Sequence, residues 1–330
     1  MKVSDFIAKY LENRGVTHCY ELVGGMITHL LDSISNKTEI NIISCHHEQS
    51  AGFAAEGHAR ITGIPGVALA TSGPGATNLL TAIASCYFDS TPAVFITGQV
   101  NTHEKTRNRG LRQLGFQETN IIEMSRPITK RSYEIDSADK IPEILDEAFN
   151  YSLSGRKGPC LVDIPMNIQS EQIGIKKANQ FLIKASNYVN KKDDTNLFDQ
   201  NYLQNLLKEI KLSLKPLVLM GGGCTSFENR KSAIEIAKLL NLPIVFSLMA
   251  VDLLPAQNNL RVGFIGSYGN RWANKALGEA DLLIVIGSRL DIRQTGSDLK
   301  SFCEGKKIFQ FDIDKTEVGV SIKPEKSFIT

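Results

Sequence analysis

The 330 residues predict an α/β protein built from two doubly wound, mostly parallel sheets. Short, continuous β-rich runs alternate with stretches of helical periodicity, as expected for strands buried on both faces of a parallel sheet. The alternation dissolves in a polar segment near residue 190 and then begins again. A chain of this length accommodates about two domains of ~100–200 residues. We therefore expect a first domain over 1–170, a linker over 171–200 and a second domain over 201–330.

The first domain is expected to begin with a short helix that follows Ser4 and ends at Gly15, because apolar residues recur there at helical spacing. The apolar runs that follow predict strands over residues 40–45, 66–71, 93–98 and 159–164. Helical patterns between these runs predict helices over residues 49–60, 76–87 and 138–152.

The second domain shows the same alternation from residue 202 onward. A helix is expected over residues 227–240. The apolar runs predict strands over residues 217–220, 244–249, 282–286 and 308–313. A second α/β sheet follows from this order.

Composition excludes several classes of function. Lys and Arg number 37 against 35 Asp and Glu, so a net charge of +2 provides no long-range field for nucleic acid or an anionic membrane. No apolar run approaches a membrane span, and no signal-peptide pattern opens the chain. The six cysteines form no C-x-x-C pair, which favours reduced thiols and a cytoplasmic location. The function must be sought in a site.

Loops at the carboxyl ends of parallel strands are the places to search, since sheets of this class bind their ligands there. Four such loops contain candidate residues: Gly24-Gly25, His46-His47-Glu48, residues 72–78 (SGPGATN) and Gly98-Gln99.

Glu48 stands where an apolar run gives way to a helical pattern. Its carboxylate could cap that helix. In an apolar pocket, the same carboxylate would have a raised pKa and could exchange a proton with a ligand. Composition does not choose between these alternatives. We interpret the adjacent His46 and His47 as local hydrogen-bonding or packing residues.

Two glycine-rich segments are candidates for phosphate-binding loops. Residues 72–78 lack the Gly-Lys-Ser/Thr of a Walker loop, so they form either a ligand-approaching turn or an ordinary strand-to-helix turn. Residues 221–226 (GGGCTS) lack the third glycine of a dinucleotide fingerprint, and no acidic residue ends the following strand. No G-x-S-x-G elbow and no H-E-x-x-H motif occurs.

Taken together, the loops resemble the pyrimidine-binding domain of thiamine-diphosphate enzymes, most closely the catalytic subunit of acetolactate (acetohydroxyacid) synthase. The second domain is similar to the family's FAD-binding central domain, and the resemblance extends over nearly the whole chain. The matching stretches are residues 47–49 (HEQ), 53–60 (FAAEGHAR), 70–79 (ATSGPGATNL), 96–100 (ITGQV), 116–118 (FQE), 154–159 (SGRKGP), 242–243 (LP), 287–293 (GSRLDIR) and 311–314 (FDID).

The resemblance implies a mechanism. Glu48 would hydrogen-bond the aminopyrimidine and promote the tautomer whose nitrogen removes the thiazolium C2 proton, so that a 2-oxo acid, pyruvate first of all, is decarboxylated and its two-carbon unit transferred to a second 2-oxo acid. Phe116 and Gln117 would border the reacting centre. The pyrimidine would be framed by Gly24, Gly25, Pro74 and Asn78.

The resemblance also implies FAD, with a structural role, or alternatively a central domain that has lost it. Mg²⁺ ligands are expected outside this chain because no Gly-Asp-Gly occurs. A homodimer or homotetramer is implied, and a chain without the diphosphate-binding domain is expected to be inactive alone. The positions that match the flavin contacts are Arg156, Tyr268, Gly269, Arg289 and Asp312.

Two departures leave the acceptor open. Residues 22–25 read LVGG where the family usually has Tyr-Pro-Gly-Gly, and residues 101–115 form a longer, basic segment. The basic segment suggests a phosphate-bearing acceptor, such as a keto-sugar in polysaccharide synthesis, as the alternative substrate. A noncatalytic cofactor-binding partner of a split enzyme is the other alternative.

Overall fold

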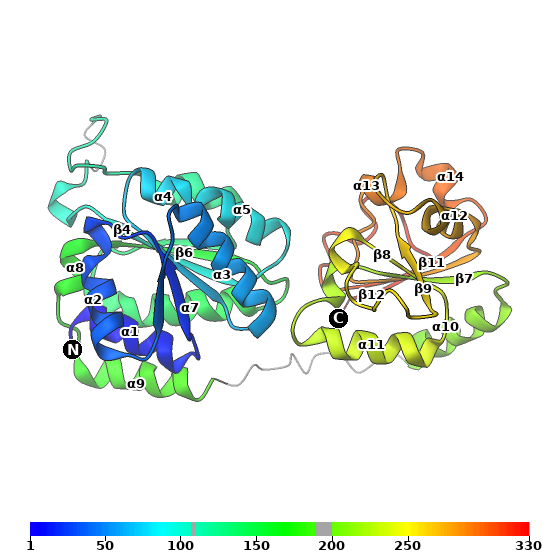
Figure 1. Cartoon of the computed structure of the whole chain (residues 1–330), viewed down its shortest axis with the longest axis horizontal. Helices are drawn as coiled ribbons and strands as arrows, with labels where there is room; N and C mark the ends of the chain where they lie inside the picture. Colours follow the sequence, from blue (N-terminus) through cyan, green and yellow to red (C-terminus); the bar gives the residue numbers. More distant parts are fainter. Residues whose placement is uncertain (107–109, 189–199, 330) are drawn as a thin grey trace. The chain divides into compact units, whose positions relative to one another are not determined.

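The computed structural model describes residues 1–106, 110–188 and 200–329. The chain divides into two units, Met1–Asn190 and Lys191–Thr330. Each unit contains a six-stranded sheet with parallel neighbours and helices on both faces (Figure 1). The predicted fold class is therefore confirmed. Among the described residues, no helix is long and apolar enough to cross a membrane.

The sheet of the first unit has the strand order β2-β1-β3-β4-β6-β5. The three strands β3, β4 and β6 are buried along their whole length, which explains their almost continuous apolar sequence. The strands are β1 His18–Glu21, β2 Asn41–Ser44, β3 Gly66–Ala70, β4 Ala93–Gln99, β5 Arg131–Glu134 and β6 Pro159–Pro165.

Side chains of this sheet alternate between two apolar cores. Val67 and Leu69 of β3 pack with α1, α2, α7 and α9, whereas Ala68 and Ala70 pack with α3, α4 and α5 on the opposite face. The helices of this unit are α1 Val3–Asn13, α2 Thr28–Lys37, α3 Glu48–Thr62, α4 Pro74–Asn78, α5 Leu80–Phe88, α6 Ile121–Ser125, α7 Ile141–Leu153, α8 Met166–Ser170 and α9 Ile175–Ser186.

Two expectations for this unit were wrong in detail, and one strand was not expected. The strand expected over 40–45 is the edge strand β2, whose residues are mostly exposed rather than buried on both faces. The single helix expected over 76–87 is two helices, α4 and α5, with a break at Leu79. Strand β5 was missed because its sequence, Arg-Ser-Tyr-Glu, is polar.

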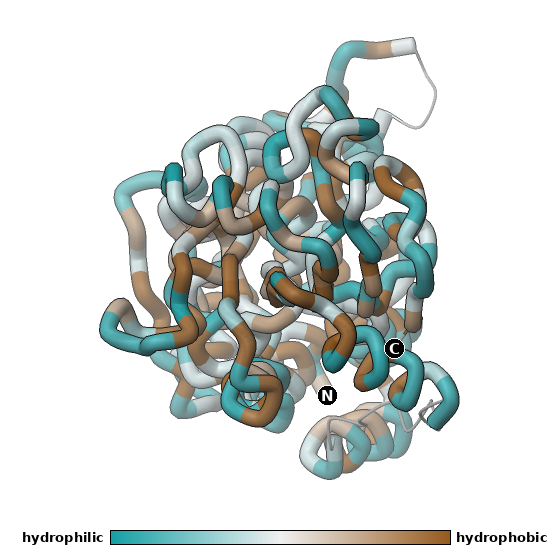
Figure 2. Tube along the Cα trace, turned by 90° about the vertical axis from the view of Figure 1, so that its right-hand side faces the viewer, coloured by the Kyte–Doolittle hydropathy of each residue, from teal (hydrophilic) through white to brown (hydrophobic). Residues whose placement is uncertain are grey.

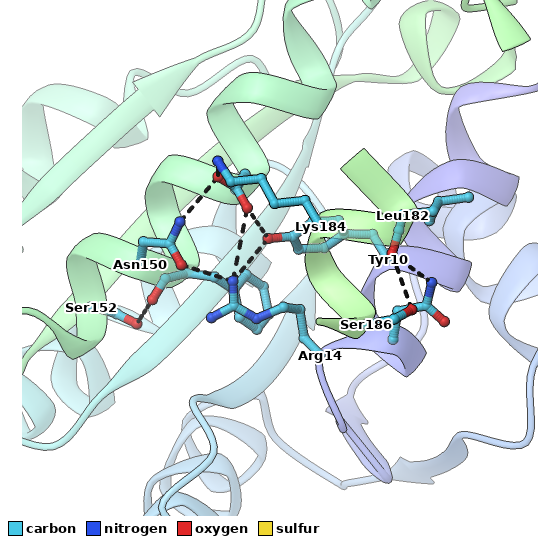
Figure 3. Close-up of polar contacts among 10 residues, drawn as sticks. Tyr10, Arg14, Asn150, Ser152, Leu182, Lys184 and Ser186 are labelled. Carbon is cyan, nitrogen blue, oxygen red and sulfur yellow. Dashed lines mark hydrogen bonds and ion pairs between the residues drawn. The ribbon is translucent and has the colours of Figure 1, made fainter. Parts of the chain in front are cut away.

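Helix α9 lies within the segment expected to be a linker, and a buried polar cluster fastens it to α1 and α7 (Figure 3). The Nη1 atom of Arg14 donates to Asn150 Oδ1 at 2.8 Å and to the Tyr10 hydroxyl at 3.2 Å. The Tyr10 hydroxyl donates to Asp146, whose second oxygen pairs with Lys184 of α9 at 2.5 Å. Half of the residues of α9 are apolar, so the segment expected to be a linker contains an amphipathic helix.

The sheet of the second unit has the strand order β12-β11-β10-β7-β8-β9. Helices α10 and α11 cover one face and α12 covers the other. In Figure 2, brown apolar segments pass through the interior of the trace and teal segments form many of its outer turns. The elements are β7 Pro216–Met220, β8 Ile244–Phe246, β9 Arg261–Phe264, β10 Leu282–Ile286, β11 Lys307–Asp312, β12 Lys326–Ile329, α10 Gln200–Leu212, α11 Asn229–Leu240, α12 Arg271–Glu279, α13 Ile292–Thr295 and α14 Leu299–Cys303.

The four strands predicted here are present as β7, β8, β10 and β11, and the predicted helix is α11. The strand expected over 244–249 ends at Phe246, because residues 248–250 turn into a short 3-10 helix. Strands β9 and β12 were not predicted. Both lie at the edges of the sheet, where continuous apolar sequence is not required.

Candidate functional site

In the first sheet, β1 and β3 are neighbours, and the strand order reverses between them: β2 lies on the other side of β1, and β4 on the other side of β3. Open α/β sheets bind ligands outside the carboxyl ends of the strands at such a reversal. The loops after β1, β2 and β3 therefore meet at the position where a ligand is expected. Three of the four loops selected from the sequence are these loops.

Glu48 is the first residue of α3 and is only 7% exposed. It does not cap the helix, since the preceding His47 does so by accepting a hydrogen bond from the Gln49 amide at Nδ1, at 3.1 Å. The capping alternative for Glu48 was wrong, and the local hydrogen-bonding role expected of His47 is confirmed. The carboxylate lies in the first turn, where the helix dipole favours a negative charge.

Asn78, the last residue of α4, donates its Nδ2 to Glu48 Oε2 at 3.0 Å. The other oxygen, Oε1, faces Gly75, since a Cβ added to that glycine would lie 3.2 Å from it. Among the described residues, Oε1 has no hydrogen-bond donor assigned to it. Asn78 therefore orients the carboxylate and leaves one oxygen for a ligand.

Thr71 joins the loop after β3 to the loop after β1. Its hydroxyl accepts a hydrogen bond from the Met26 amide at 3.2 Å, and a Cβ added to Gly24 would lie 2.4 Å from the Thr71 Cβ. Gly25 is exposed and a Cβ there would meet nothing within 4 Å. Gly24 is thus required by a close backbone approach, whereas Gly25 adjoins open space.

The turn before α4 depends on a glycine and a proline in sequence. Gly73 has φ +69° and ψ −132°, a conformation that other residues rarely adopt. Pro74 follows at the start of α4, where its fixed φ suits the helix and its missing N–H is not needed. The turn places Gly75 and Asn78 next to the Glu48 carboxylate, which is the arrangement that a ligand-approaching turn requires.

Phe116 and Gln117 lie in the loop that approaches this turn. Gln117 has φ +64°, and a Cβ added to Gly73 would lie 2.7 Å from the Gln117 Cβ. Phe116 is 75% exposed, so its ring contributes an uncovered apolar surface. Glu118 fixes the loop by accepting hydrogen bonds from the Thr106 and Leu114 amides. Burial opposes ionisation of Glu118, but these bonds, a third from the Thr106 hydroxyl and the charge of Lys105 outweigh it and lower the pKa of Glu118.

A buried polar network lies behind this loop, and sequence reasoning missed it. Asp163 of β6 accepts hydrogen bonds from Thr97 Oγ1 at 2.6 Å and from Gln99 Nε2 at 3.0 Å, both on β4. Burial raises the pKa of Asp163 to about 6, although these two bonds and Lys105 oppose the shift. The available signal was a polar residue inside each of two otherwise apolar strands.

A second missed carboxylate, Glu21, ends β1 and is 1% exposed. Its Oε1 accepts a hydrogen bond from Ser44 Oγ on β2, while its buried Oε2 has no partner among the described atoms. Burial is the main cause that raises the pKa of the neighbouring Cys45, and the negative charge of Glu21 raises it further.

In the second unit, the strand order reverses between β7 and β10. The loops after these strands pack backbone to backbone, because a Cβ added to Gly221 would lie 2.1 Å from the Gly287 carbonyl oxygen. This glycine contact was not predicted. The sequence of segment 221–226 lacks the third glycine of a dinucleotide fingerprint, but its position after β7 is that of a ligand-binding loop.

The five positions matched to flavin contacts lie in both units, Arg156 in the first and the other four in the second. Arg156 belongs to the first unit, where its Nε donates to Ser90 Oγ at 2.9 Å. Arg289 lies 3.7 Å from Asp291 and 4.0 Å from Glu317. Tyr268 is 76% exposed and accepts a long hydrogen bond of 3.4 Å from Arg293. The remaining two positions, in the loop before α12 and at the end of β11, are Gly269 and Asp312.

These features define the class: a two-domain α/β protein whose first domain presents a buried carboxylate–amide pair at a sheet reversal. The family model described as "Thiamine pyrophosphate enzyme, N-terminal TPP binding domain" matches residues 1–124, and "Thiamine pyrophosphate enzyme, central domain" matches residues 203–330. The chain belongs to the thiamine pyrophosphate enzymes, of which it carries these two domains.

Similar curated proteins are acetolactate synthases. "Acetolactate synthase 1, chloroplastic" of Nicotiana tabacum is 37% identical over 327 residues, which are 99% of this chain and 47% of that protein. The Escherichia coli isozyme 1 large subunit is 36% identical over 97% of this chain and 54% of its own length. The probable large subunit of Methanocaldococcus jannaschii is 34% identical, covering 98% and 53%. The chain spans about half the length of these relatives.

Proposed function

We propose that this chain supplies the pyrimidine-binding and central domains of a thiamine-diphosphate-dependent carboligase of the acetolactate synthase type. The proposed reaction decarboxylates pyruvate and transfers the two-carbon unit to a second 2-oxo acid. The observation that carries the proposal is Glu48, a buried carboxylate with one oxygen held by Asn78 and the other left for a ligand. The names of the relatives support the same reaction.

The donor set fits the cofactor. When bound, thiamine diphosphate supplies an electron sink for decarboxylation of a 2-oxo acid. Glu48 can donate or accept a proton at Oε1, while Asn78 keeps the carboxylate from rotating. Gly24, Gly25 and Pro74 are proposed to frame the pyrimidine ring, since Gly25 adjoins open space and Pro74 is exposed. Phe116 and Gln117 are proposed to limit the acceptor side.

Mg²⁺ is proposed to be held by residues outside this chain. Among the described residues, no group of three or more His, Cys, Asp and Glu is placed to hold a metal ion. The diphosphate of the cofactor is likewise proposed to be bound by residues outside this chain.

The keto-sugar alternative depended on the basic segment 101–115. Its Lys105 pairs with Glu134 at 2.8 Å and is 13% exposed, so that charge is already neutralised. Part of the remaining segment, residues 107–109, lies outside the described residues. The Lys105 pair therefore removes one of the cations on which the keto-sugar alternative rested.

Product analysis tests the proposal. The protein that carries this chain is supplied with pyruvate, thiamine diphosphate and Mg²⁺, and products are identified with pyruvate alone, with 2-oxobutyrate and with a keto-sugar. Acetolactate-type products support the proposal, and a sugar adduct supports the alternative acceptor. Absence of CO₂ release, despite tight cofactor binding, would instead support a noncatalytic partner.

For the second unit we propose FAD as the ligand of the loops after β7 and β10. The support is the sheet reversal at these strands, the glycine contact of Gly221 with Gly287, and the guanidinium of Arg289 nearby in sequence. We expect Arg289→Ala to lower the affinity for FAD, measured by flavin fluorescence. A preparation that binds no flavin at saturating FAD would show that this domain is empty.

A homo-oligomer is proposed from exposed apolar side chains on two adjacent helices of the first unit. Ile61 of α3 is 77% exposed and Phe88 of α5 is 67% exposed, and each helix carries a second partly exposed aromatic residue, Phe53 on α3 and Tyr87 on α5. Analytical ultracentrifugation tests this proposal. A dimer that dissociates in the Phe88→Lys variant supports it, and a wild-type monomer contradicts it.

A further inference from the structure

A continuous series of hydrogen bonds connects the interior of the first sheet with the loop at the candidate site. It begins at Asp163 on β6, passes through Gln99 on β4 and reaches the Thr119 carbonyl, at 3.0 and 2.8 Å. The Thr119 hydroxyl donates to the Gln117 carbonyl at 3.2 Å. The series ends at the residue that packs against the Gly73 turn.

Gln99 is the branching point of the series and is only 3% exposed. Its Nε2 donates both to Asp163 and to Thr119, while its Oε1 accepts a hydrogen bond from the Val100 amide at 3.0 Å. The Val100 bond fixes which end of the amide is the oxygen, because the backbone amide can only donate. The side-chain amide therefore has one orientation that satisfies all three partners.

The loop needs such an anchor. Gln117 occupies left-handed φ space, at +64°, which is unfavourable for a residue with a Cβ. Its neighbour Phe116 is 75% exposed and provides little packing to hold the segment. An unfavourable backbone conformation persists only where the surrounding contacts determine it.

We infer that Asp163 is a positioning residue, which acts through Gln99 to hold residues 117–119 against the Gly73 turn and thereby places Phe116 and Gln117 at the candidate site. The inference rests on the proposed function only in assigning these two residues to the acceptor side. Asp163 itself touches no ligand position, since it is 2% exposed.

The charge of Asp163 strengthens the anchor, because hydrogen bonds to an ionised acceptor exceed those to a neutral one. Besides Thr97 and Gln99, the charged groups that act on it are Lys105, which favours ionisation, and Glu134, which opposes it. Burial places its pKa at about 6. The anchor is therefore expected to weaken as the pH falls from 7 to 5.

Hydrogen exchange of the unliganded 330-residue chain, read by mass spectrometry, tests the inference. The amides of Leu114, Gly115 and Glu118 make hydrogen bonds within the loop and report its opening. Gln99→Met removes the donor to Thr119, and we expect roughly tenfold faster exchange at these amides. Thr97→Val is the matched control, because the Thr97 hydroxyl bonds the same carboxylate and donates no hydrogen bond to the described residues of the loop.

Equal acceleration in both variants, or no acceleration in Gln99→Met, would overturn the inference. Asp163→Asn adds a second readout, because the amide can keep both bonds once the Thr97 hydroxyl turns to accept. After correction for intrinsic exchange, the wild-type loop should open more readily as the pH falls from 7 to 5. The opening of the Asp163→Asn loop should not change over this range. If the Asn variant does not fold, the first comparison decides alone. No ligand is present, so a failure of the carboligase proposal leaves this result interpretable.

Discussion

Replacing Asp163 with Asn is expected to change how the stability of the first unit depends on pH. Burial raises the pKa of Asp163 from 3.8 to about 6, with the hydrogen bonds from Thr97 and Gln99 opposing the shift. Between these two values the folded protein holds a proton that the unfolded chain has lost. Folding therefore takes up a proton, and the wild-type free energy of unfolding falls as the pH rises through this window.

The magnitude follows from the shift. About two pKa units at about 1.4 kcal/mol each correspond to a loss of roughly 3 kcal/mol in the wild-type free energy of unfolding. This loss is complete above pH 6 and absent below the ordinary pKa of Asp. Asn does not titrate, so this contribution is missing in the variant. The difference in unfolding free energy, variant minus wild type, should therefore rise by about 3 kcal/mol between pH 3.5 and pH 7.

The most slowly exchanging amides of β4 and β6 provide the assay, because exchange through global opening of the first unit reports its unfolding free energy separately from that of the second. Comparing the two proteins at each pH cancels the other titrating groups. A difference that stays flat would show that the pKa of Asp163 has its ordinary value, and a difference that falls with rising pH would show that this pKa is lowered; either result contradicts the argument.

Two further predictions concern stability and cofactor binding. Arg14→Met should lower the unfolding free energy of the first unit by about 3 kcal/mol, because it removes a buried cation beside Asp146. Lys184→Met should lower it by less than about 1 kcal/mol, since the Lys184 side chain is 59% exposed. Equal losses of the two variants in urea unfolding would contradict this distinction. Gly24→Ala should weaken thiamine diphosphate binding in calorimetry, because its Cβ would lie 2.4 Å from Thr71, whereas Gly25→Ala should bind as the wild type does.

The sequence predicted the elements whose residues repeat one simple pattern. The continuous apolar runs of β3, β4 and β6 predict buried central strands, because both faces of each strand are covered. The glycine and proline of the 72–78 turn likewise predict its conformation, since few other residues adopt it. The hydrogen bond between Glu48 and Asn78 was not predicted, because 30 residues separate them and the family resemblance assigned each only to the pyrimidine.

Other features depend on contacts that no local pattern encodes. Gln99 and Asp163 are 64 residues apart and become partners only because β4 and β6 are neighbours in register. Helix α9 was missed because its amphipathic sequence, with six apolar residues among twelve, was grouped with the polar segment that follows it. The edge strands β5 and β9 are short and each is covered by one neighbouring strand, so their sequences carry little apolar signal.

The central claim is that Glu48 provides proton transfer to a bound thiamine diphosphate. The direct measurement is the carboligation rate of Glu48→Gln in the protein that carries this chain, with Glu56→Gln as control. Glu56 is a buried carboxylate on the same helix, but it pairs with Arg60 and not with Asn78. We expect Glu48→Gln to lower the rate roughly 10²–10⁴-fold, with cofactor affinity changed far less, and Glu56→Gln to retain most activity. A Glu48→Gln enzyme that turns over pyruvate at nearly the wild-type rate would contradict the claim.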